Sequence, residues 1–237
     1  MPEPMHRNHL GQEIGPPLPD WTPRPRPPRT ALQGRLCLLE PLDADSHARA
    51  LHEAYGEDTE GRNWTYLPYG PFPSAEAYAE WVKARQHQDD PLFYVISLAS
   101  SGRPVGVASY LRIDPEMGSL EVGSLCYAPA LQRSPASTEA MYLMMRRAFD
   151  ELGYRRYEWK CDALNGPSRR AAERLGFRYE GTLRQMMVIK QRSRDSAWYS
   201  ILDSEWPRLR TAFERWLDPT NFGASGAQRR RLEELRP

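Results

Sequence analysis

Apolar and polar residues follow a pattern that switches repeatedly between strand-like and helix-like spacing. Runs rich in β-branched and aromatic residues predict strands at 35–42, 92–99, 104–113, 118–128, 154–163, 177–184 and 196–203. In YRRYEWKCDA, Tyr157, Trp159 and Cys161 alternate with Glu158 and Lys160, as the two faces of a strand do. The turn signals SSGR and DPEMG between the central runs predict an antiparallel meander.

Segments with helix-spaced apolar residues separate these strands. They predict helices at 43–56, at 75–88 with Ser74 as N-cap, from Ser134 to the stop at Gly153, at 167–176 and at 205–217. In the third segment one apolar stripe contains Met141, Met144, Met145, Ala148, Phe149 and Leu152. In the fourth, Pro167 takes the first helical position and Gly176 the end. Together these elements predict an α+β domain of about seven strands.

The two ends of the chain differ from this pattern. Residues 1–30 contain nine prolines and few residues that could form a core, which predicts an extended arm. Residues 218–237 predict a polar C-terminal tail with a solvated basic run, so the folded domain is expected over 31–217. With 237 residues, of which 40% are hydrophobic, the chain is long enough for one sizeable core.

Composition narrows the classes of function and location. The 32 lysines and arginines nearly balance 31 acidic residues, so no global charge predicts nucleic-acid or membrane binding. The sequence has no apolar stretch near the ~20 residues of a membrane span and no apolar N-terminal signal core, so we expect a cytoplasmic protein. Cys37, Cys126 and Cys161 are scattered, which argues against a disulfide framework. The five histidines lack metal-ligand spacing, so no metal is expected.

The stretch LQRSPASTEA, residues 131–140, carries the first candidate chemistry. Ser134 can cap the helix that follows, Pro135 fits its first position, and Ala136 is small enough for a ligand to approach the backbone. Further donors at the turn are Arg133, Ser137 and Thr138. Because a helix N-terminus presents unpaired N–H groups and a partial positive charge, this turn can bind phosphate. The alternative is a well-capped helix without a ligand.

Two motifs together resemble the GCN5-related N-acetyltransferases. After the strand that ends in Tyr127–Ala–Pro129, Gln132 matches the start of the family's Q/R-x-x-G-x-G/A turn, and Glu139–Ala140 match its common ending. One helix later, N-x-x-S-x-x-A-A-E-R-L-G-F, residues 165–177, is the most specific signal. The stretches TYLPYGPF and WYSILDSEW resemble the branch that acetylates ribosomal-protein N-termini and small amines. The resemblance covers about residues 35–217.

The resemblance implies a mixed, mostly antiparallel sheet flanked by helices, and a direct transfer of acetyl from acetyl-coenzyme A to an amine. Pro135 and Ser137 stand where the family has glycine, and Pro135 removes one N–H, so Arg133, Ser137 and Thr138 would supplement the remaining amides. The implied cofactor-binding residues are Leu125, Tyr127, Gln132, Arg133, Ser134, Ala136, Ser137, Thr138, Asn165 and Ser168. The implied partner is an amine acceptor, and the protein would be a monomer or homodimer.

Acetyl transfer to an amine requires a base for the amine and an acid for the thiolate. Glu121, a charge inside a strand, is the candidate base; alternatively it faces solvent or pairs with an arginine. Ser168 is the candidate acid, or else a helix-cap residue. Tyr199 is a rival acid because a phenol has a pKa near that of a thiol, or else a core tyrosine.

The acceptor site is expected where aromatic residues gather before the second helix. These residues are Trp64, Tyr66, Tyr69 and Phe72. They could form the walls of an apolar slot or surround a cationic amine, or they could be core residues. A non-catalytic module with the same fold, with or without coenzyme A, is the alternative for the whole protein. Nucleotide-enzyme and serine-hydrolase functions are disfavoured, because neither G-x-x-x-x-G-K-[ST] nor G-x-S-x-G occurs in the sequence.

Overall fold

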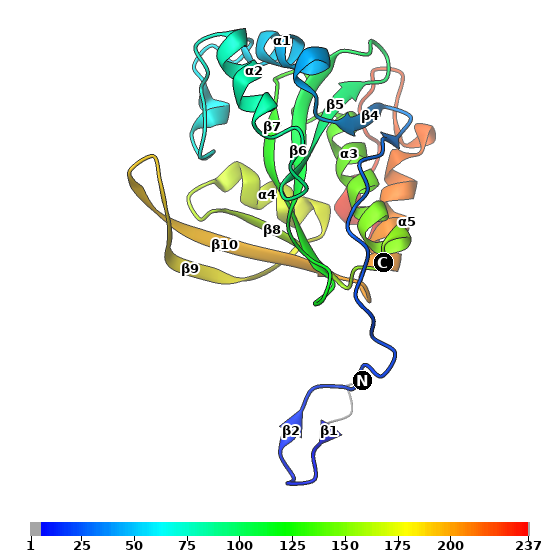
Figure 1. The fold of residues 1–237 in the computed structure, drawn as a ribbon. Coiled ribbons are helices and arrows are strands. Elements are labelled where there is room, and N and C mark those ends of the chain that lie inside the picture. The colour runs from blue at the N-terminus through cyan, green and yellow to red at the C-terminus, as the bar shows by residue number, and fades with distance from the viewer. Residues whose placement is uncertain (1–5, 237) are drawn as a thin grey trace.

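The computed structural model describes residues 6–236, so five residues of the predicted arm and the last residue of the predicted tail lie outside the described residues. An eight-stranded sheet forms the centre of the molecule, in the order β3-β4-β5-β6-β7-β8-β10-β9 (Figure 1). Its strands are β3 (Leu32–Gln33), β4 (Cys37–Pro41), β5 (Leu92–Leu98), β6 (Pro104–Asp114), β7 (Ser119–Tyr127), β8 (Arg156–Asp162), β9 (Arg178–Ile189) and β10 (Arg192–Leu202). All neighbours are antiparallel except the parallel pair β7–β8.

This sheet confirms the α+β prediction, and each of the seven predicted strands is present. The eighth strand, β3, has only two residues. The hairpin β9–β10 is longer than predicted because its strands continue to a tight turn at Lys190 and Gln191, both with positive φ (49° and 61°). Such turns favour Asn and Gly, so the residues at this turn gave no sequence signal for it.

The helices are α1 (Ala44–Tyr55), α2 (Ala75–Lys83), α3 (Pro135–Arg146), α4 (Gly166–Leu175) and α5 (Trp206–Leu217). Ser74 caps α2 as predicted, since its Oγ accepts the Ala77 amide at 3.2 Å. A π-helical turn, Arg147–Glu151, extends α3 towards the predicted stop. The N-cap of α4 is Asn165 and its first residue is Gly166, so Pro167 takes the second position and not the predicted first.

Two layers of helices cover the two faces of the sheet. On β5, the Phe93 ring packs against Trp81 of α2 with centroids 5.5 Å apart. The next residue, Tyr94, points to the other face, where its hydroxyl oxygen lies 3.3 Å from the Arg147 guanidinium that follows α3. The helices α1 and α2 therefore lie over one face, and α3 over the opposite face (Figure 1).

The N-terminal segment runs along the body before it enters the sheet. Backbone carbonyls of this segment accept hydrogen bonds from Tyr154 (to Pro25, 3.2 Å), Tyr94 (to Pro28, 2.8 Å) and Arg147 (to Thr30, 2.7 Å). Before it, β1 (His6–Arg7) and β2 (Glu13–Ile14) form a hairpin that projects away from the body, which the sequence did not predict (Figure 1).

The segment after α5 folds back onto the body. Asn221 is buried and its side-chain amide donates to the Trp216 carbonyl at 3.0 Å and the Arg230 carbonyl at 3.2 Å. Leu232 and Leu235 are also buried, in a single 3₁₀ turn that packs against α4 and α5. These two leucines follow the basic run and add to the core, a role that the polar character of the segment did not indicate.

Residues 6–236 also show whether any helix could span a membrane and in what state the cysteines are. No helix there is both long enough and apolar enough to span a bilayer. Cys37, Cys126 and Cys161 are free thiols in buried positions. Burial raises the pKa of Cys126 to about 12, so this thiol stays protonated at neutral pH.

Candidate active site

The parallel strands β7 and β8 separate part-way along their length. They pair only over Ser119–Val122 and Arg156–Trp159, so the remainder of β7, residues 123–127, has no partner in β8. A cavity of about 210 Å³ opens at this separation, and we call it the β7–β8 cavity. Its lining comes from β6, β7, β8, the start of α4, the β9–β10 hairpin and the loop that contains Asn63. The observed strand order therefore leaves an opening between β7 and β8 that an extended ligand arm can enter.

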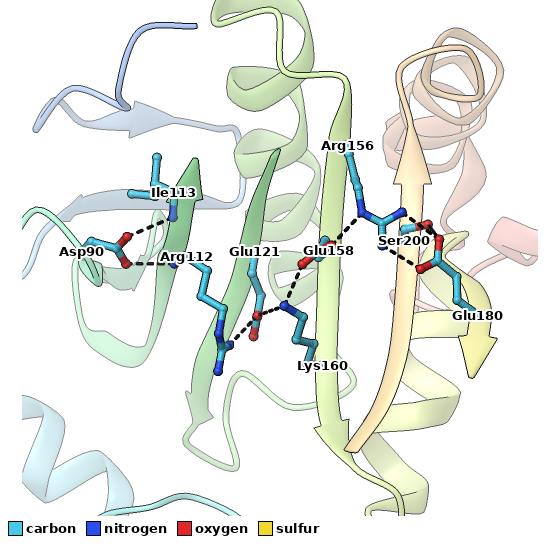
Figure 2. A network of polar contacts seen from close by, with 9 residues as sticks. All are labelled: Asp90, Arg112, Ile113, Glu121, Arg156, Glu158, Lys160, Glu180 and Ser200. Carbon is cyan, nitrogen blue, oxygen red and sulfur yellow. Dashed lines mark hydrogen bonds and ion pairs between the residues drawn. The ribbon is translucent and has the colours of Figure 1, made fainter. Parts of the chain in front are cut away.

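Glu121 lies in the wall of this cavity and is only 3% exposed. Its Oε2 is 2.6 Å from Arg112 Nη1 and 3.1 Å from Lys160 Nζ (Figure 2). Lys160 Nζ lies 3.5 Å from the centroid of the Trp198 ring. A cation between a carboxylate and an aromatic ring is stabilised by both, so Lys160 is held firmly beside Glu121.

The ion pairs continue across β8 to the edge of the sheet. Lys160 Nζ lies 2.7 Å from Glu158 Oε2, and Arg156 Nε lies 2.6 Å from Glu158 Oε1. Arg156 also binds both carboxylate oxygens of Glu180, at 2.8 and 2.6 Å, and Glu180 accepts the Ser200 hydroxyl at 2.5 Å (Figure 2). Alternating charges thus connect the cavity wall to β9.

The two glutamates of this network differ in their pKa. Burial raises the pKa of Glu121 above its ordinary value, although Lys160 and Arg112 oppose the shift. Burial acts in the same direction on Glu158, but the hydrogen bonds and charges of Lys160 and Arg156 outweigh it, so the pKa of Glu158 is lowered. Glu121 is therefore the carboxyl of the pair that takes up a proton more readily, and it is the one that lines the cavity.

The turn at the start of α3 is well capped from within. Ser134 Oγ accepts the Ser137 amide at 3.2 Å, and Ser137 Oγ donates to the Ser134 carbonyl at 2.7 Å. Arg133 is exposed and has a left-handed backbone, φ 57°. Buried Thr138 accepts a hydrogen bond from Arg174 of α4 at 3.0 Å, which brings a second arginine to this turn. Ala136, also buried, belongs to the first turn of α3, whose amides have no partner within the helix.

Gln132 and Tyr127 stabilise the end of β7. Gln132 Nε2 donates to the Tyr127 carbonyl and to Asn63 Oδ1, each at 2.9 Å. The Tyr127 hydroxyl is buried without a hydrogen-bond partner within residues 6–236, and this residue does not line the cavity. Leu125, two residues earlier, does line it. Of these three predicted cofactor-binding residues, the structure places only Leu125 at the cavity.

Asn165 and Ser168 lie together in the cavity wall. Asn165 Oδ1 caps α4 by accepting the Ser168 amide at 3.1 Å. Trp159 Nε1 donates to Ser168 Oγ at 3.0 Å. The asparagine-led motif thus brings both residues to the cavity, and Asn165 rather than Ser168 is the cap of α4.

Tyr199, the rival acid, does not line the cavity. It is fully buried, and its hydroxyl accepts from Arg169 Nε at 3.0 Å and donates to Glu173 Oε1 at 3.4 Å. Both partners belong to α4. The structure therefore places this phenol between β10 and α4 and does not bring it together with Glu121 and Ser168.

The four predicted acceptor residues separate into two groups. Tyr66 lines the cavity, and its hydroxyl donates to the Leu164 carbonyl at 3.2 Å, so it joins the loop before α2 to the turn before α4. Trp64, Tyr69 and Phe72 belong to a cluster of aromatic rings packed on the core, with centroid distances of 5.6 Å for Trp64–Phe72 and 6.2 Å for Trp64–Tyr69. These three are core residues and do not line the cavity.

Comparison with known proteins identifies the family. The family model described as "Acetyltransferase (GNAT) domain" matches residues 35–178. The chain belongs to this family. A crystal structure of a GCN5-related N-acetyltransferase from Brucella melitensis is 46% identical, with a TM-score of 0.91, and the match covers 92% of this chain and 99% of that one.

Two further relatives support the assignment to this family. A structure titled a probable acetyltransferase from Chromobacterium violaceum ATCC 12472 is 40% identical, with a TM-score of 0.75, over 82% of this chain and 96% of that one. The protein named "Putative ribosomal N-acetyltransferase YdaF" from Bacillus subtilis (strain 168) is 28% identical over 171 residues, 71% of this chain and 91% of its own length. The prediction of an acyl-coenzyme A-dependent N-acetyltransferase is confirmed at the level of the family.

Several residues of the GNAT cavity were not predicted from the sequence. They are Arg112, Lys160, Met186, Met187, Arg194, Ser196 and Trp198. The alternation around Lys160 was visible, but an alternating charged face is more often exposed to solvent than buried beside a ligand site. Lys160 is buried only because β10 and the β9–β10 hairpin cover it, and that depends on strand order rather than on local pattern.

Proposed function

We propose that this GNAT protein transfers the acetyl group of acetyl-coenzyme A to a primary amine, by direct attack with both substrates bound in the β7–β8 cavity. The acceptor amine belongs to a small molecule or to a protein N-terminus. One observation carries the proposal: a buried carboxylate, Glu121, and a hydroxyl, Ser168, line the same cavity where two parallel strands separate. The similarity to YdaF supports the branch that acts on N-termini.

The residues at the strand opening fit acetyl-coenzyme A, which supplies the acetyl thioester when bound. Residues 123–127 of β7 lack a partner strand in β8, so this edge can hydrogen-bond an amide-containing arm. In the proposal, Arg133 and the first-turn amides of α3 bind the pyrophosphate. Arg174 adds positive charge there through its contact with Thr138. Pro135 contributes no N–H, so the arginines compensate for the missing donor.

Glu121 takes the proton of the attacking amine, directly or through a water. Arg112 and Lys160 both contact its Oε2, at 2.6 and 3.1 Å. In the proposal Oε1 accepts the proton, while Oε2 fixes the orientation of the carboxylate. Because the carboxyl is buried and its pKa is raised, it is a stronger base than an exposed glutamate.

Ser168 donates the proton that the departing thiolate needs. The Trp159 indole donates to its Oγ, so the hydroxyl hydrogen is directed away from the indole. Asn165 fixes the backbone of the same residue through the Ser168 amide. Positioning of this hydroxyl and of Glu121 in the wall of one cavity accounts for the acceleration, as expected for a ternary-complex mechanism.

An acetylation screen with purified protein tests the proposed reaction. Acetyl-coenzyme A is mixed with small amines, polyamines, amino acids and N-terminal peptides, and free thiol release and acetylated product are measured together. We expect amine-dependent thiol release with stoichiometric product for at least one class. Saturable coenzyme A binding without product from any class would contradict catalysis and favour the non-catalytic module.

A further inference from the structure

The β7–β8 cavity contains an arginine, Arg194, that forms no ion pair within residues 6–236. We propose that the acetyl acceptor carries an anionic group, a carboxylate or a phosphate, and that Arg194 and Ser196 bind this group. The inference rests on the proposed function, because it assigns a substrate class to the same site. It concerns the part of the cavity formed by β10 and the β9–β10 hairpin.

The three cations of the cavity wall differ in whether they contact an acidic side chain. Arg112 and Lys160 both contact Glu121, and Lys160 also contacts Glu158. Arg194 is half-buried, and in the described chain its guanidinium forms no ion pair and its buried Nε has no hydrogen-bond partner. A guanidinium that is partly desolvated and unpaired loses hydration without compensation, so an anionic ligand restores the lost interactions.

Ser196 provides a second, independent indication of a ligand. It is 2% exposed, lines the same cavity, and its Oγ has no hydrogen-bond partner within residues 6–236. Ser196 lies two residues after Arg194 in β10; the β9–β10 pairing shifts register between them, and both residues line the cavity. A buried hydroxyl without a partner is costly unless a ligand satisfies it.

The surrounding residues restrict the kind of ligand. Asp162, which pairs with Ser196 across β8 and β10, also lines the cavity, and Asp195 follows Arg194 in the chain. Their Oδ1 atoms accept the Leu164 amide at 2.8 Å and the Gln185 amide at 2.7 Å, and neither carboxylate forms an ion pair with Arg194 in the described residues. Met186, Met187 and Trp198 form an apolar wall beside the two donors. A ligand with an apolar linker between its amine and its anionic group fits this combination. The planar guanidinium suits carboxylate and phosphate equally.

The test compares charged acceptors with uncharged counterparts of the same length. The probes are ω-amino carboxylates, their carboxamides and aminoalkyl phosphates, assayed with wild type, Arg194→Gln, Ser196→Ala and the control Arg192→Gln. Arg192 is exposed and lies on the same strand outside the cavity. We expect Arg194→Gln to raise KM for the preferred anionic class about 10-fold or more. The same substitution should raise KM for the carboxamides less than about 2-fold. Ser196→Ala should raise it about 3-fold, and Arg192→Gln should have no effect.

A binding measurement separates this inference from the transfer reaction. The ligands are N-acetylated ω-amino carboxylates and N-acetylated aminoalkyl phosphates, which cannot react further. Each is titrated into the protein while tryptophan fluorescence is measured, because Trp159 and Trp198 line the cavity. Loss of binding in Arg194→Gln, without any detectable acetyl transfer by wild type, would support the anion site and refute the proposed reaction. Equal losses for charged and uncharged probes would overturn the anion site. A raised KM for acetyl-coenzyme A in Arg194→Gln would assign the arginine to the cofactor instead.

Discussion

Glu121 is a residue of the buried sheet that also faces the candidate site. Its side chain is buried in the sheet, yet it faces a cavity and contacts two cations through a single oxygen. The sequence offered two alternatives, a base or a carboxylate paired with an arginine. The structure shows the pairing with Arg112, and the cavity position keeps the base role as a proposal.

The pH dependence of Glu121→Gln tests that role. In wild type, kcat/KM should fall as pH falls through the raised pKa of Glu121, because protonation removes the base. The variant should lose this acidic limb and be roughly 100-fold slower near neutral pH, with recovery at higher pH as more amine is neutral. Rate measurements across the pH range, with thermal melting to verify folding, provide the comparison.

Glu158→Gln is the matched control for this profile. Glu158 contacts the same Lys160 but does not line the cavity. The variant should therefore retain the acidic limb of wild type, even if stability decreases. A Glu121→Gln profile with an unchanged acidic limb would remove this residue from the base role.

Sequence reasoning predicted some of the residues that line the cavity and missed others. Asn165 and Ser168 were predicted together, and both line it, because a contiguous motif fixes both the turn and the helix start. Trp64, Tyr69 and Phe72 were assigned to the acceptor site from aromatic density, but a dense group of rings also gains free energy by packing on itself, as it does here. Arg194 gave no signal, because only strand pairing brings it to the cavity.

At the scale of elements, Glu139 connects α3 to the first strands. Its carboxylate accepts the amides of Arg35 (3.1 Å), Leu36 (2.6 Å) and Cys37 (2.9 Å) and is buried. A Cβ on Gly34 would lie 2.3 Å from this carboxylate, which explains the glycine there. The glutamate that matched the family turn by sequence therefore has a structural contact that fixes the start of α3.

Glu139→Gln should lower the free energy of unfolding by about 2 kcal/mol, because an amide group replaces one acceptor oxygen among three donors. Urea denaturation measures the change. Glu53→Gln is the control, since Glu53 of α1 is exposed and contacts exposed Arg49, and its loss should cost less than about 0.5 kcal/mol. Equal effects of the two substitutions would contradict the role of Glu139.

The boundaries of helices and strands were predicted correctly where local residues determine them. They were missed where contacts with distant segments determine them. The predicted helix at 75–88 ends earlier, at Lys83. Arg29 of the arm donates to the Gln86 carbonyl at 2.7 Å and to the Gln88 carbonyl, so a segment distant in sequence holds these carbonyls. Periodicity within the helix carries no information about such a partner.

At the scale of the molecule, the fold was predictable because hydrophobic periodicity fixes the elements and the family motifs fix their order. The attachments at both ends were not predictable in the same way. The arm is held by its backbone carbonyls, which every sequence has, and by side chains such as Arg29, whose partners are distant in sequence. The C-terminal leucines follow a basic run. The candidate active site depends on where β7 and β8 cease to pair, which is a property of the whole sheet.

The most direct test is a calorimetric titration of acetyl-coenzyme A into wild type, Ser137→Glu and Thr211→Glu. Ser137 and Thr211 are comparable, since each hydroxyl donates to a carbonyl of its own helix region, at 2.7 and 3.1 Å, but Thr211 lies on α5. We predict saturable one-to-one binding at sub-millimolar ligand for wild type and Thr211→Glu. Ser137→Glu should weaken it about 10-fold or more, because the new charge repels pyrophosphate at the start of α3. No saturable binding by wild type, or equal binding by all three proteins, would contradict the account.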